Sequence, residues 1–490
     1  MRRFALLISS GAFSSGIAFG SFAGWDEARV WILVCTGIAV TLCLVFRRES
    51  VLFVVWLGMC AFGGMFLAVH EGEYYRALEE QNNVQGVGVV RGEMSIGALD
   101  ARLVLSASDC EGHICPKENI LFRTSQYETF TDGMRVYFGP CNLKRPEQFD
   151  PNFDYPMYLA KEGIGFVATR CPITRIPTRG DWFGAGLHAT RVFIASMIGK
   201  WIPEPEAGLA RGLILGGSDE LPETLVRDFR TVGLSHIVAV SGYNISVLAG
   251  GLFLVGIGLG WYRKRAVWIA LLGTVLFVFL VGAPASAVRA ALVALVGFGA
   301  LLVSRPVPSM SILCFAAALM LMGNPLLLRY DIGFQLSFLA TFAILFSAPW
   351  RSRFQKFHWF IGYFIEAFLI TFSVLLFVTP LTLVYFGTLS PYALFANVIA
   401  LPLVPITFLL SLLVVLLGWI PGIGALIGWI AYGTLHGLIV IVEIMARFPG
   451  ANASFSSVRW WMIALWYGNC FLFLLWQRRL LRKSEETEMI

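Results

Sequence analysis

The chain has 490 residues, of which 57% are hydrophobic and only 14% are charged, and its mean hydropathy is +0.72. A soluble globular chain is usually about 25% charged. Many runs here contain roughly 18 or more apolar residues, which the core of a soluble protein does not require. Composition therefore excludes an ordinary soluble protein and predicts a polytopic α-helical membrane protein with roughly 12 membrane segments.

The net charge of +6 does not indicate a nucleic-acid-binding surface. Residues 70–181 contain 12 Lys and Arg against 16 Asp and Glu, whereas the rest of the chain contains 25 against 15. The basic excess lies in short loops such as 261–265 and 351–356, as the positive-inside rule expects of cytoplasmic loops. The alternating count predicts that both termini lie in the cytoplasm.

Residues 1–69 are predicted to form three N-terminal transmembrane helices. Residues 1–24 have the composition of a secretory signal peptide. Two apolar segments, Val30–Phe46 and Val51–Val69, follow directly, so a retained first span is the preferred interpretation. The third span would then deliver the chain to the outer side of the membrane near His70.

Residues 70–180 are predicted to form an extracytoplasmic β domain inserted after the third span. Short β-type stretches separated by Gly, Asp and Pro favour a small barrel of the OB type, and a β-sandwich fits the pattern nearly as well. The five predicted strands are Val84–Gly92, Ala101–Ser108, Asn119–Thr124, Met134–Cys141 and Gly163–Arg170.

Four cysteines lie in this domain, and an even number in an oxidising compartment is typical of disulfides. Three pairings are possible. The preferred one joins Cys110 to Cys115 across a turn and Cys141 to Cys171 between two strand ends. A zinc site that also uses His113 is the alternative, although the sequence has no CxxC pair.

Residues 181–232 are predicted to form amphipathic helices at the membrane interface, because apolar and aromatic side chains there are mixed with His, Arg and Lys. Residues 233–477 follow as the transmembrane core, and 478–490 as a charged cytoplasmic tail. Broken helices at membrane depth survive only where they face protein or a water-filled cavity. Gly or Pro is expected to interrupt the core helices at Gly282–Pro284, Thr379–Pro380, Pro402–Pro405 and Ile420–Gly424.

Motifs of catalysis are missing from the sequence. It contains neither a G-x-x-x-x-G-K-[ST] loop nor an H-E-x-x-H pair, so we expect no catalytic residue, no metal and no cofactor. Ser241 with His236 suggests the nucleophile and base of a membrane enzyme. On one helix, however, a spacing of five residues places their side chains about 140° apart, which disfavours that interpretation.

Polar residues inside the core are few, and such residues are costly and often functional. Arg289 and Asp331 are charged, and the plain alternative for them is an internal ion pair with each other. Val232–Gly250 is the densest polar stretch. As one helix it would place His236 and Tyr243 on one face, and a break at Gly233 or Gly242 is the other geometry. Polar contacts between helices and the wall of a hydrated path both remain open.

The stretch "DFRTVGLSHIVAVSGYNISVLAG" resembles the signature of the ComEC family of competence proteins, the inner-membrane channel for DNA uptake. Further blocks resemble this family in its order along nearly the whole chain. These blocks are Pro146–Phe166, Ala207–Pro222, Gly282–Leu292, Asn324–Thr341 and Thr379–Pro405.

The resemblance implies a bacterial inner (plasma) membrane channel that translocates single-stranded DNA into the cytoplasm during natural transformation, with the OB-like domain helping to receive the DNA. A transporter for a smaller anionic solute is the alternative function. The candidates for lining the channel are His236, Ser241, Gly242, Tyr243, Asn244, Arg289, Asp331, Gln335 and Asn397.

Two features depart from the family pattern. Tyr243 and Asn244 stand where many members have Leu-His, and the metallo-β-lactamase-like domain that ends many members is missing, along with its H-x-H-x-D-H motif. The implied partners are single-stranded DNA, membrane lipid, a cytoplasmic helicase or ATPase, DNA-binding proteins and a separate nuclease, with a homo-oligomer left open. Cations that could neutralise DNA phosphates in the core are Arg211, Arg227, Arg230, Arg289 and Arg329.

Overall fold

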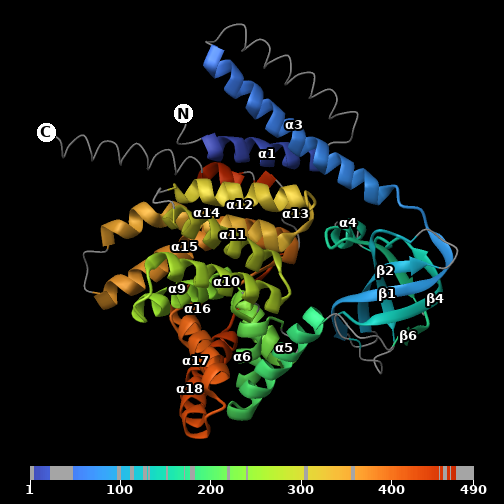
Figure 1. Ribbon diagram of the computed structural model, residues 1–490. Helices are drawn as coiled ribbons and strands as arrows, with labels where there is room; N and C mark the ends of the chain where they lie inside the picture. The colour runs from blue at the N-terminus through green and yellow to red at the C-terminus, as the bar shows by residue number, and fades with distance from the viewer. Residues whose placement is uncertain are drawn as a thin grey trace. The chain divides into compact units, whose positions relative to one another are not determined.

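The computed structural model consists of two compact units, residues 1–196 with 245–335 and residues 197–244 with 336–490 (Figure 1). The predicted span Val30–Phe46, His113 and the tail 478–490 lie outside the described residues. The structure describes residues 5–22, 48–96, 101–110, 115–124, 130, 133–149, 153–169, 171–176, 182–217, 221–238, 241–302, 307–354, 359–451, 453–455, 461–463 and 465–470.

The first unit contains the β domain and the helices that flank it in the chain. α1 packs against α3 and α12. A Cβ on Gly16 of α1 would lie 1.8 Å from the carbonyl oxygen of Ala61 on α3, so glycine permits the two backbones to approach this closely. The helices of this unit are α1 (Ala5–Phe22), α3 (Arg48–Arg76), α4 (Tyr155–Ala160), α10 (Arg263–Val281), α11 (Ala285–Leu302), α12 (Ser309–Gly323) and α13 (Leu327–Tyr330).

The second unit is built mainly from helices, with one short ladder between β7 (Thr388–Leu389) and β8 (Ala453–Ser454). Three helices run from one unit into the other: α5 (Trp182–Trp201), α9 (Gly242–Gly258) and α14 (Ile332–Phe354). The other helices of this unit are α6 (Glu206–Leu215), α7 (Glu223–Thr231), α8 (Ser235–Val238), α15 (Trp359–Phe386), α16 (Ala393–Ala400), α17 (Leu403–Leu417) and α18 (Pro421–Ala446).

The β domain is a closed barrel of five strands with a sixth strand on its edge. The strand order is β1-β2-β3-β5-β4, and β4 pairs back with β1 to close the ring. The neighbours β3 and β5 are parallel. The predicted five-stranded barrel is confirmed, and the alternative sandwich does not form. The strands are β1 (Gln81–Ile96), β2 (Ala101–Cys110), β3 (Asn119–Thr124), β4 (Arg135–Lys144), β5 (Ile164–Thr169) and the unpredicted β6 (Ile173–Arg175).

Alternation along β2 and β4 places every second side chain inside the barrel. Phe122 and Phe138 meet edge to face there, with ring centroids 5.5 Å apart, and both are fully buried. Burying a side chain of this size contributes about 1.5–3 kcal/mol. Two disulfides, Cys110–Cys115 and Cys141–Cys171, tie the strand ends in the pairing preferred from the sequence.

The break expected at Gly282–Pro284 separates α10 from α11. Gly282 has a φ of +89°, and the amides at this position and the next donate to two carbonyls of the last helical turn. These are the hydrogen bonds of a Schellman cap, which requires a left-handed residue. Arg191 donates from Nε to the carbonyl of Leu280 at 2.7 Å, so a cation also stabilises the negative end of α10.

The prediction of a helix break at Thr379–Pro380 is wrong, because α15 continues through Pro380. A proline inside a helix leaves the carbonyl four residues earlier without its usual amide donor. Here the indole of Trp466 supplies the donor, since its Nε1 donates to the carbonyl of Leu376 at 2.8 Å. The other two breaks form, with a bend of 43° between α16 and α17 and a new helix start at Pro421.

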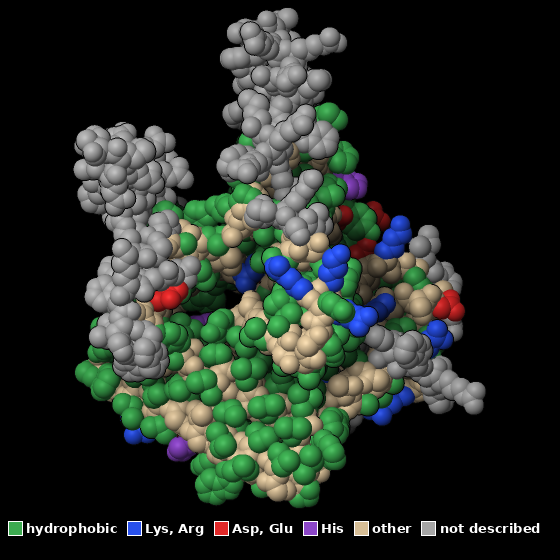
Figure 2. All heavy atoms as spheres, turned by 60° about the vertical axis from the view of Figure 1, so that its left-hand side comes forward, with side chains coloured by type: hydrophobic (Ala, Val, Ile, Leu, Met, Phe, Trp, Pro, Cys, Tyr) green, Lys and Arg blue, Asp and Glu red, His purple; other side chains and the backbone are tan. Residues whose placement is uncertain are grey.

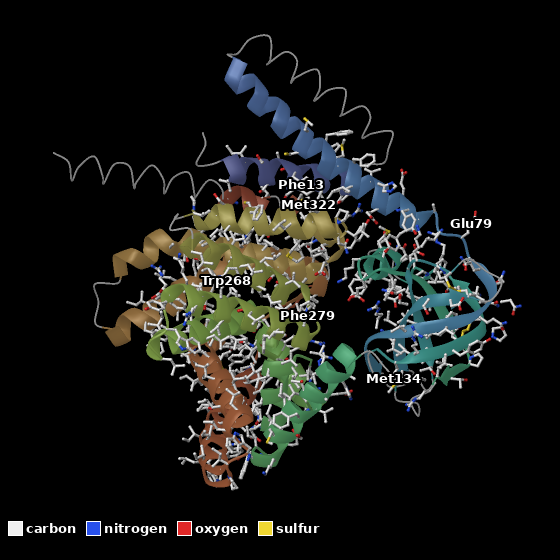
Figure 3. All side chains as sticks on the ribbon, viewed as in Figure 1. Phe13, Glu79, Met134, Trp268, Phe279 and Met322 are labelled. Carbon is white, nitrogen blue, oxygen red and sulfur yellow. A yellow bond between two sulfur atoms is a disulfide. The ribbon has the colours of Figure 1, made fainter. Side chains whose placement is uncertain are left out.

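Among the described residues, four helices are long and apolar enough to cross a membrane, or five if the bent pair of α16 and α17 is one span. Large apolar side chains project from the helices of the first unit, such as Trp268 and Phe279 from α10 and Met322 from α12 (Figure 3). Figure 2 shows hydrophobic side chains over most of the visible described surface, with few charged ones. Such a surface suits contact with lipid.

Candidate functional site

An ion pair joins the β domain to the helices within the first unit. Lys161 follows α4, in the connection from β4 to β5, and its Nζ lies 3.0 Å from Oδ2 of Asp331. Both side chains are nearly buried, with exposures of 10% and 12%. The two residues are 170 positions apart and belong to different family-like blocks. The pair therefore fixes the end of α4 to the start of α14.

Asp331 is also the N-cap of α14. Its Oδ1 accepts a hydrogen bond from the amide of Phe334 at 2.8 Å, which satisfies a free donor of the first helical turn. Asn324 adds a second link, because its Nδ2 donates to the carbonyl of Lys161 at 2.7 Å. The partner of Asp331 is thus Lys161, and the expected alternative pair with Arg289 is wrong.

Gln335 and Arg329, from the family-like block Asn324–Thr341, both donate hydrogen bonds to backbone carbonyls. Nε2 of Gln335 donates to the carbonyls of Leu328 and Arg329 at 2.8 and 3.0 Å. The guanidinium of Arg329 donates to the carbonyl of Ser21 and lies 4.5 Å from the ring centroid of Phe22. Both side chains therefore connect α13 to its neighbours.

In the second unit, the polar stretch after Gly233 is broken into two helices. α8 ends at Val238 and α9 begins at Gly242, so the single helix face considered for His236 and Tyr243 does not form. Ser241 is the N-cap of α9, since its Oγ lies 3.4 Å from the amide of Asn244 and donates to Oδ1 of that residue at 3.3 Å.

Asn244 makes a polar contact between helices. Its Nδ2 donates to the carbonyl of Leu213, near the end of α6, at 3.1 Å, and its side chain is only 1% exposed. This geometry matches the interhelical alternative for Asn244. Tyr243 differs, because 46% of its surface is exposed, and His236 is also exposed.

Gly233 and Asn397 belong to one packed contact. Gly233 has a φ of +77°, and a Cβ on it would lie 2.8 Å from the Cβ of Ala393 on α16. Asn397 is buried on the same helix and donates to the carbonyl of Ala393 at 2.8 Å. Two family-like blocks therefore meet where only a glycine fits.

The candidate residues fall into two groups. His236, Ser241, Gly242, Tyr243, Asn244 and Asn397 belong to the second unit, and Arg289, Asp331 and Gln335 to the first. Arg289 is buried in α11, beyond the cap at Gly282. The structure places Ser241 beside Asn244, and Asp331 beside Gln335.

The cations of the second unit differ in their surroundings. Arg211 is paired with Glu204, with 2.5 Å between Nη2 and Oε1. Arg227 and Arg230 are exposed on α7, whose opposite face buries Leu225 and Phe229. The exposed residues of α7 also include Glu223, so its solvent side carries both signs of charge.

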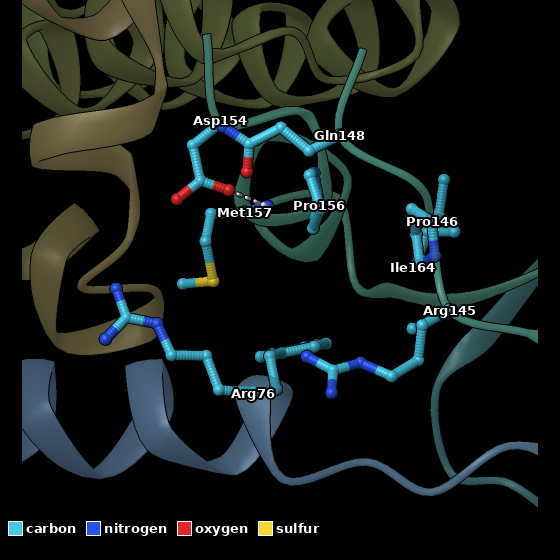
Figure 4. A pocket seen from close by; sticks show the side chains of 10 residues that line it. Arg76, Arg145, Pro146, Gln148, Asp154, Pro156, Met157 and Ile164 are labelled. Carbon is cyan, nitrogen blue, oxygen red and sulfur yellow. Dashed lines mark hydrogen bonds between the residues drawn. The ribbon is translucent and has the colours of Figure 1, made fainter. Parts of the chain in front are cut away.

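Sequence reasoning missed a pocket of about 190 Å³ in the first unit. Asp154, Pro156 and Met157, at the start of α4, line one side, and Arg76 and Arg145 line the opposite side (Figure 4). Tyr75 at the end of α3 also lines it, and burial raises the pKa of this phenol to about 12, so it stays neutral at physiological pH. No local pattern in the sequence indicated this pocket, because Arg76 ends α3 whereas Arg145 follows β4.

A second pair was also missed. Oε1 of Glu206, on α6, lies 2.8 Å from Nδ1 of His436, on α18, and the carboxylate side chain is 5% exposed. The imidazole stacks on the ring of Tyr432 with centroids 5.4 Å apart. Among the described residues, no group of three or more His, Cys, Asp or Glu side chains has the arrangement of a metal site.

Long apolar helices and a closed, disulfide-bonded barrel define a helical membrane-type protein with a small β domain. The family model described as competence protein matches residues 213–480, which is more than half of the chain. The chain therefore belongs to the competence protein family, as the resemblance predicted. This membership supports a role in DNA uptake for transformation.

ComE operon protein 3 of Bacillus subtilis (strain 168) is 30% identical over 196 residues. The alignment covers 40% of this chain and 25% of that relative, so the chain matches a quarter of the relative's length. No solved structure shows a significant match.

Proposed function

We propose that this chain is a multi-pass channel of the bacterial inner membrane that passes single-stranded DNA to the cytoplasm during natural transformation. Family membership over residues 213–480 supports the link to DNA uptake. The observation that carries the proposal further is the ion pair of Lys161 and Asp331, because it ties the barrel to a helix of the family-matched region.

In this proposal the barrel is an OB-like receiver on the outer side of the membrane. Its support is the closed ring of five strands, an architecture that binds single strands in many proteins. The roughly twelve membrane segments, and the placement of both termini in the cytoplasm, remain predictions from hydropathy and from the basic loops.

We propose different roles for the candidate path residues. Tyr243 and His236, which are exposed, and Arg289, which is a buried cation beyond a helix break, are proposed to face the strand. Asn244 and Asp331 are proposed to hold the surrounding helices, because their side chains bond to neighbouring segments.

The proposed channel conducts DNA without cleaving it and without hydrolysing nucleotides. Its sequence contains no Walker A loop and no H-x-H-x-D-H motif. A cytoplasmic helicase or ATPase, together with DNA-binding proteins, would then pull the strand, and a separate nuclease would degrade its complement.

Deletion of the gene tests this function. Labelled DNA should still bind to the cell surface but should not become nuclease-resistant in the cytoplasm, and re-expression of the chain should restore uptake. Normal cytoplasmic uptake in the deletion strain would reject the proposal. Loss of uptake of a small anionic solute by the deletion strain, with DNA uptake intact, would favour the transporter alternative.

A further inference from the structure

We propose that four aromatic rings around α4 and the adjoining arginine pocket form a binding site for single-stranded DNA. The inference rests on the proposed function and places the contact beside the barrel wall, in the connection from β4 to β5. The rings, called the aromatic platform below, are Phe149, Phe153, Tyr155 and Tyr158.

The platform is a contiguous set of rings rather than isolated surface residues. The ring centroids of Phe149 and Tyr155 are 5.5 Å apart, and those of Phe153 and Tyr158 are 5.3 Å apart. Tyr155 and Tyr158 are nearly parallel, with 15° between their planes. Phe149 is 68% exposed and Phe153 is 36% exposed. The two exposed Phe rings can stack on bases of any sequence, while Tyr155 and Tyr158 are partly buried beside them.

Cations lie directly beside this platform. The same short segment carries both features, because Asp154, Pro156 and Met157 line the pocket while Tyr155 and Tyr158 belong to the platform. Across the pocket, Arg76 and Arg145 provide two positive charges (Figure 4). A single strand requires both elements, cations for its phosphates and flat faces for its bases.

The size of the pocket argues against an enclosed small ligand. Its volume of about 190 Å³ is below the range of roughly 300–1,000 Å³ typical of small-molecule sites. A pocket of this size suits one phosphate group of a strand that continues outside it. The carboxylate of Asp154 is engaged as the N-cap of α4, where it accepts from the amide of Met157 at 3.1 Å.

Exposed Phe side chains also suit a lipid surface, but the short helix and the neighbouring polar pocket favour DNA. α4 has only six residues, whereas interfacial helices bury a long apolar face. The platform also adjoins a polar pocket. Lys161 continues the site toward the core, because its Nζ lies 4.3 Å from the ring centroid of Tyr158 while it pairs with Asp331.

The test uses the full chain in zwitterionic nanodiscs and a fluorescent oligothymidylate. Anisotropy should show that the double variant Phe149→Ala/Phe153→Ala binds about 5-fold to 100-fold more weakly. Arg145→Ala should lower the slope of log affinity against log salt by about 0.7. Phe149→Trp keeps a flat ring and should bind like the wild type. Arg91→Ala, at an exposed position of β1, is the control for the loss of one positive charge elsewhere on the barrel.

Unchanged binding by the double variant, with both disulfides intact by peptide mapping, would overturn the site. A photoreactive phenylalanine analogue at position 149 should crosslink to the oligonucleotide, and crosslinking to lipid instead would show a membrane anchor and also overturn it. Failure of the site differs from failure of the function. If cells with the double variant take up DNA normally while the deletion strain does not, the channel function is supported and the aromatic platform is rejected as a DNA-binding site.

Discussion

Lys161 and Asp331 lie 3.0 Å apart although 170 positions separate them in the chain. One residue ends a short helix of the β domain, and the other begins α14. The contact thus connects a domain outside the family-matched segment with a helix inside it. If DNA first meets the barrel, this pair is one described contact through which DNA binding could affect α14.

The substitution Lys161→Gln should destabilise the contact between α4 and α14 by about 3–5 kcal/mol, because it leaves a nearly buried carboxylate without its cation. Thermal unfolding in detergent measures the loss. Asp331→Asn removes the charge and keeps an oxygen for the helix cap, so the double variant should be more stable than Lys161→Gln alone. Additive losses in the two single variants and the double variant would show that the pair is not coupled.

The substitution Gly233→Ala should destabilise the second unit by about 2 kcal/mol or more. A side chain at φ +77° is strained, and its Cβ would lie 2.8 Å from that of Ala393. Gly250→Ala is the matched control, since it lies within α9 with no atom within 4 Å of the added Cβ, and it should be neutral or stabilising. Equal stability of both variants would contradict the packed contact.

The substitution Trp466→Phe should cost about 1–3 kcal/mol, because the carbonyl of Leu376 loses its donor. Pro380→Ala restores a backbone amide that can donate to the same carbonyl. In the Pro380→Ala background, Trp466→Phe should therefore cost less. The unfolding midpoint of the four proteins gives the comparison, and an undiminished cost in that background would refute the compensation.

The substitution Asn244→Asp removes the amide donor and places a carboxylate in a buried position. The carboxylate keeps an acceptor for Ser241 but cannot donate to the carbonyl of Leu213, so stability should fall by about 1–3 kcal/mol. Asn244→His supplies a ring donor and should retain more of the transformation frequency than Asn244→Ala. If all three variants transform like the wild type, the contact with α6 is dispensable.

The two disulfides should differ in their contribution to stability. Cys141–Cys171 closes a sequence separation of 30 and Cys110–Cys115 one of 5. Loop entropy predicts losses of about 3.6 and about 2.1 kcal/mol on paired replacement by Ser. Protease resistance of the barrel under graded urea would measure them. A larger loss for the shorter loop would mean that strand geometry, rather than loop closure, sets the difference.

The sequence predicted the features that local rules govern. Alternation and turn residues located the five barrel strands, and Gly282 followed by Pro284 located a helix end whose cap needs a left-handed residue. Ser241 also stands three residues before Asn244, which is the spacing of a helix N-cap, within the densest polar stretch of the core.

The features that depend on distant partners were not predictable. Pro380 indicates a break by local rules, yet Trp466, 90 positions beyond Leu376, supplies the missing donor. Nothing near Asp331 in the chain indicates Lys161 as its partner, and the pocket residues Arg76 and Arg145 come from separate segments. A single sequence shows composition and the spacing of apolar residues, but these contacts depend on the tertiary arrangement.

The closed ring also sets an order of events during synthesis. Because β5 lies between β3 and β4, the barrel can close only after translation has passed Thr169. At roughly 5–20 residues per second, Asp331 is then made about 8 to 32 seconds later. The β domain can thus fold and oxidise before its docking partner exists, and its attachment to the core is a late step of biogenesis.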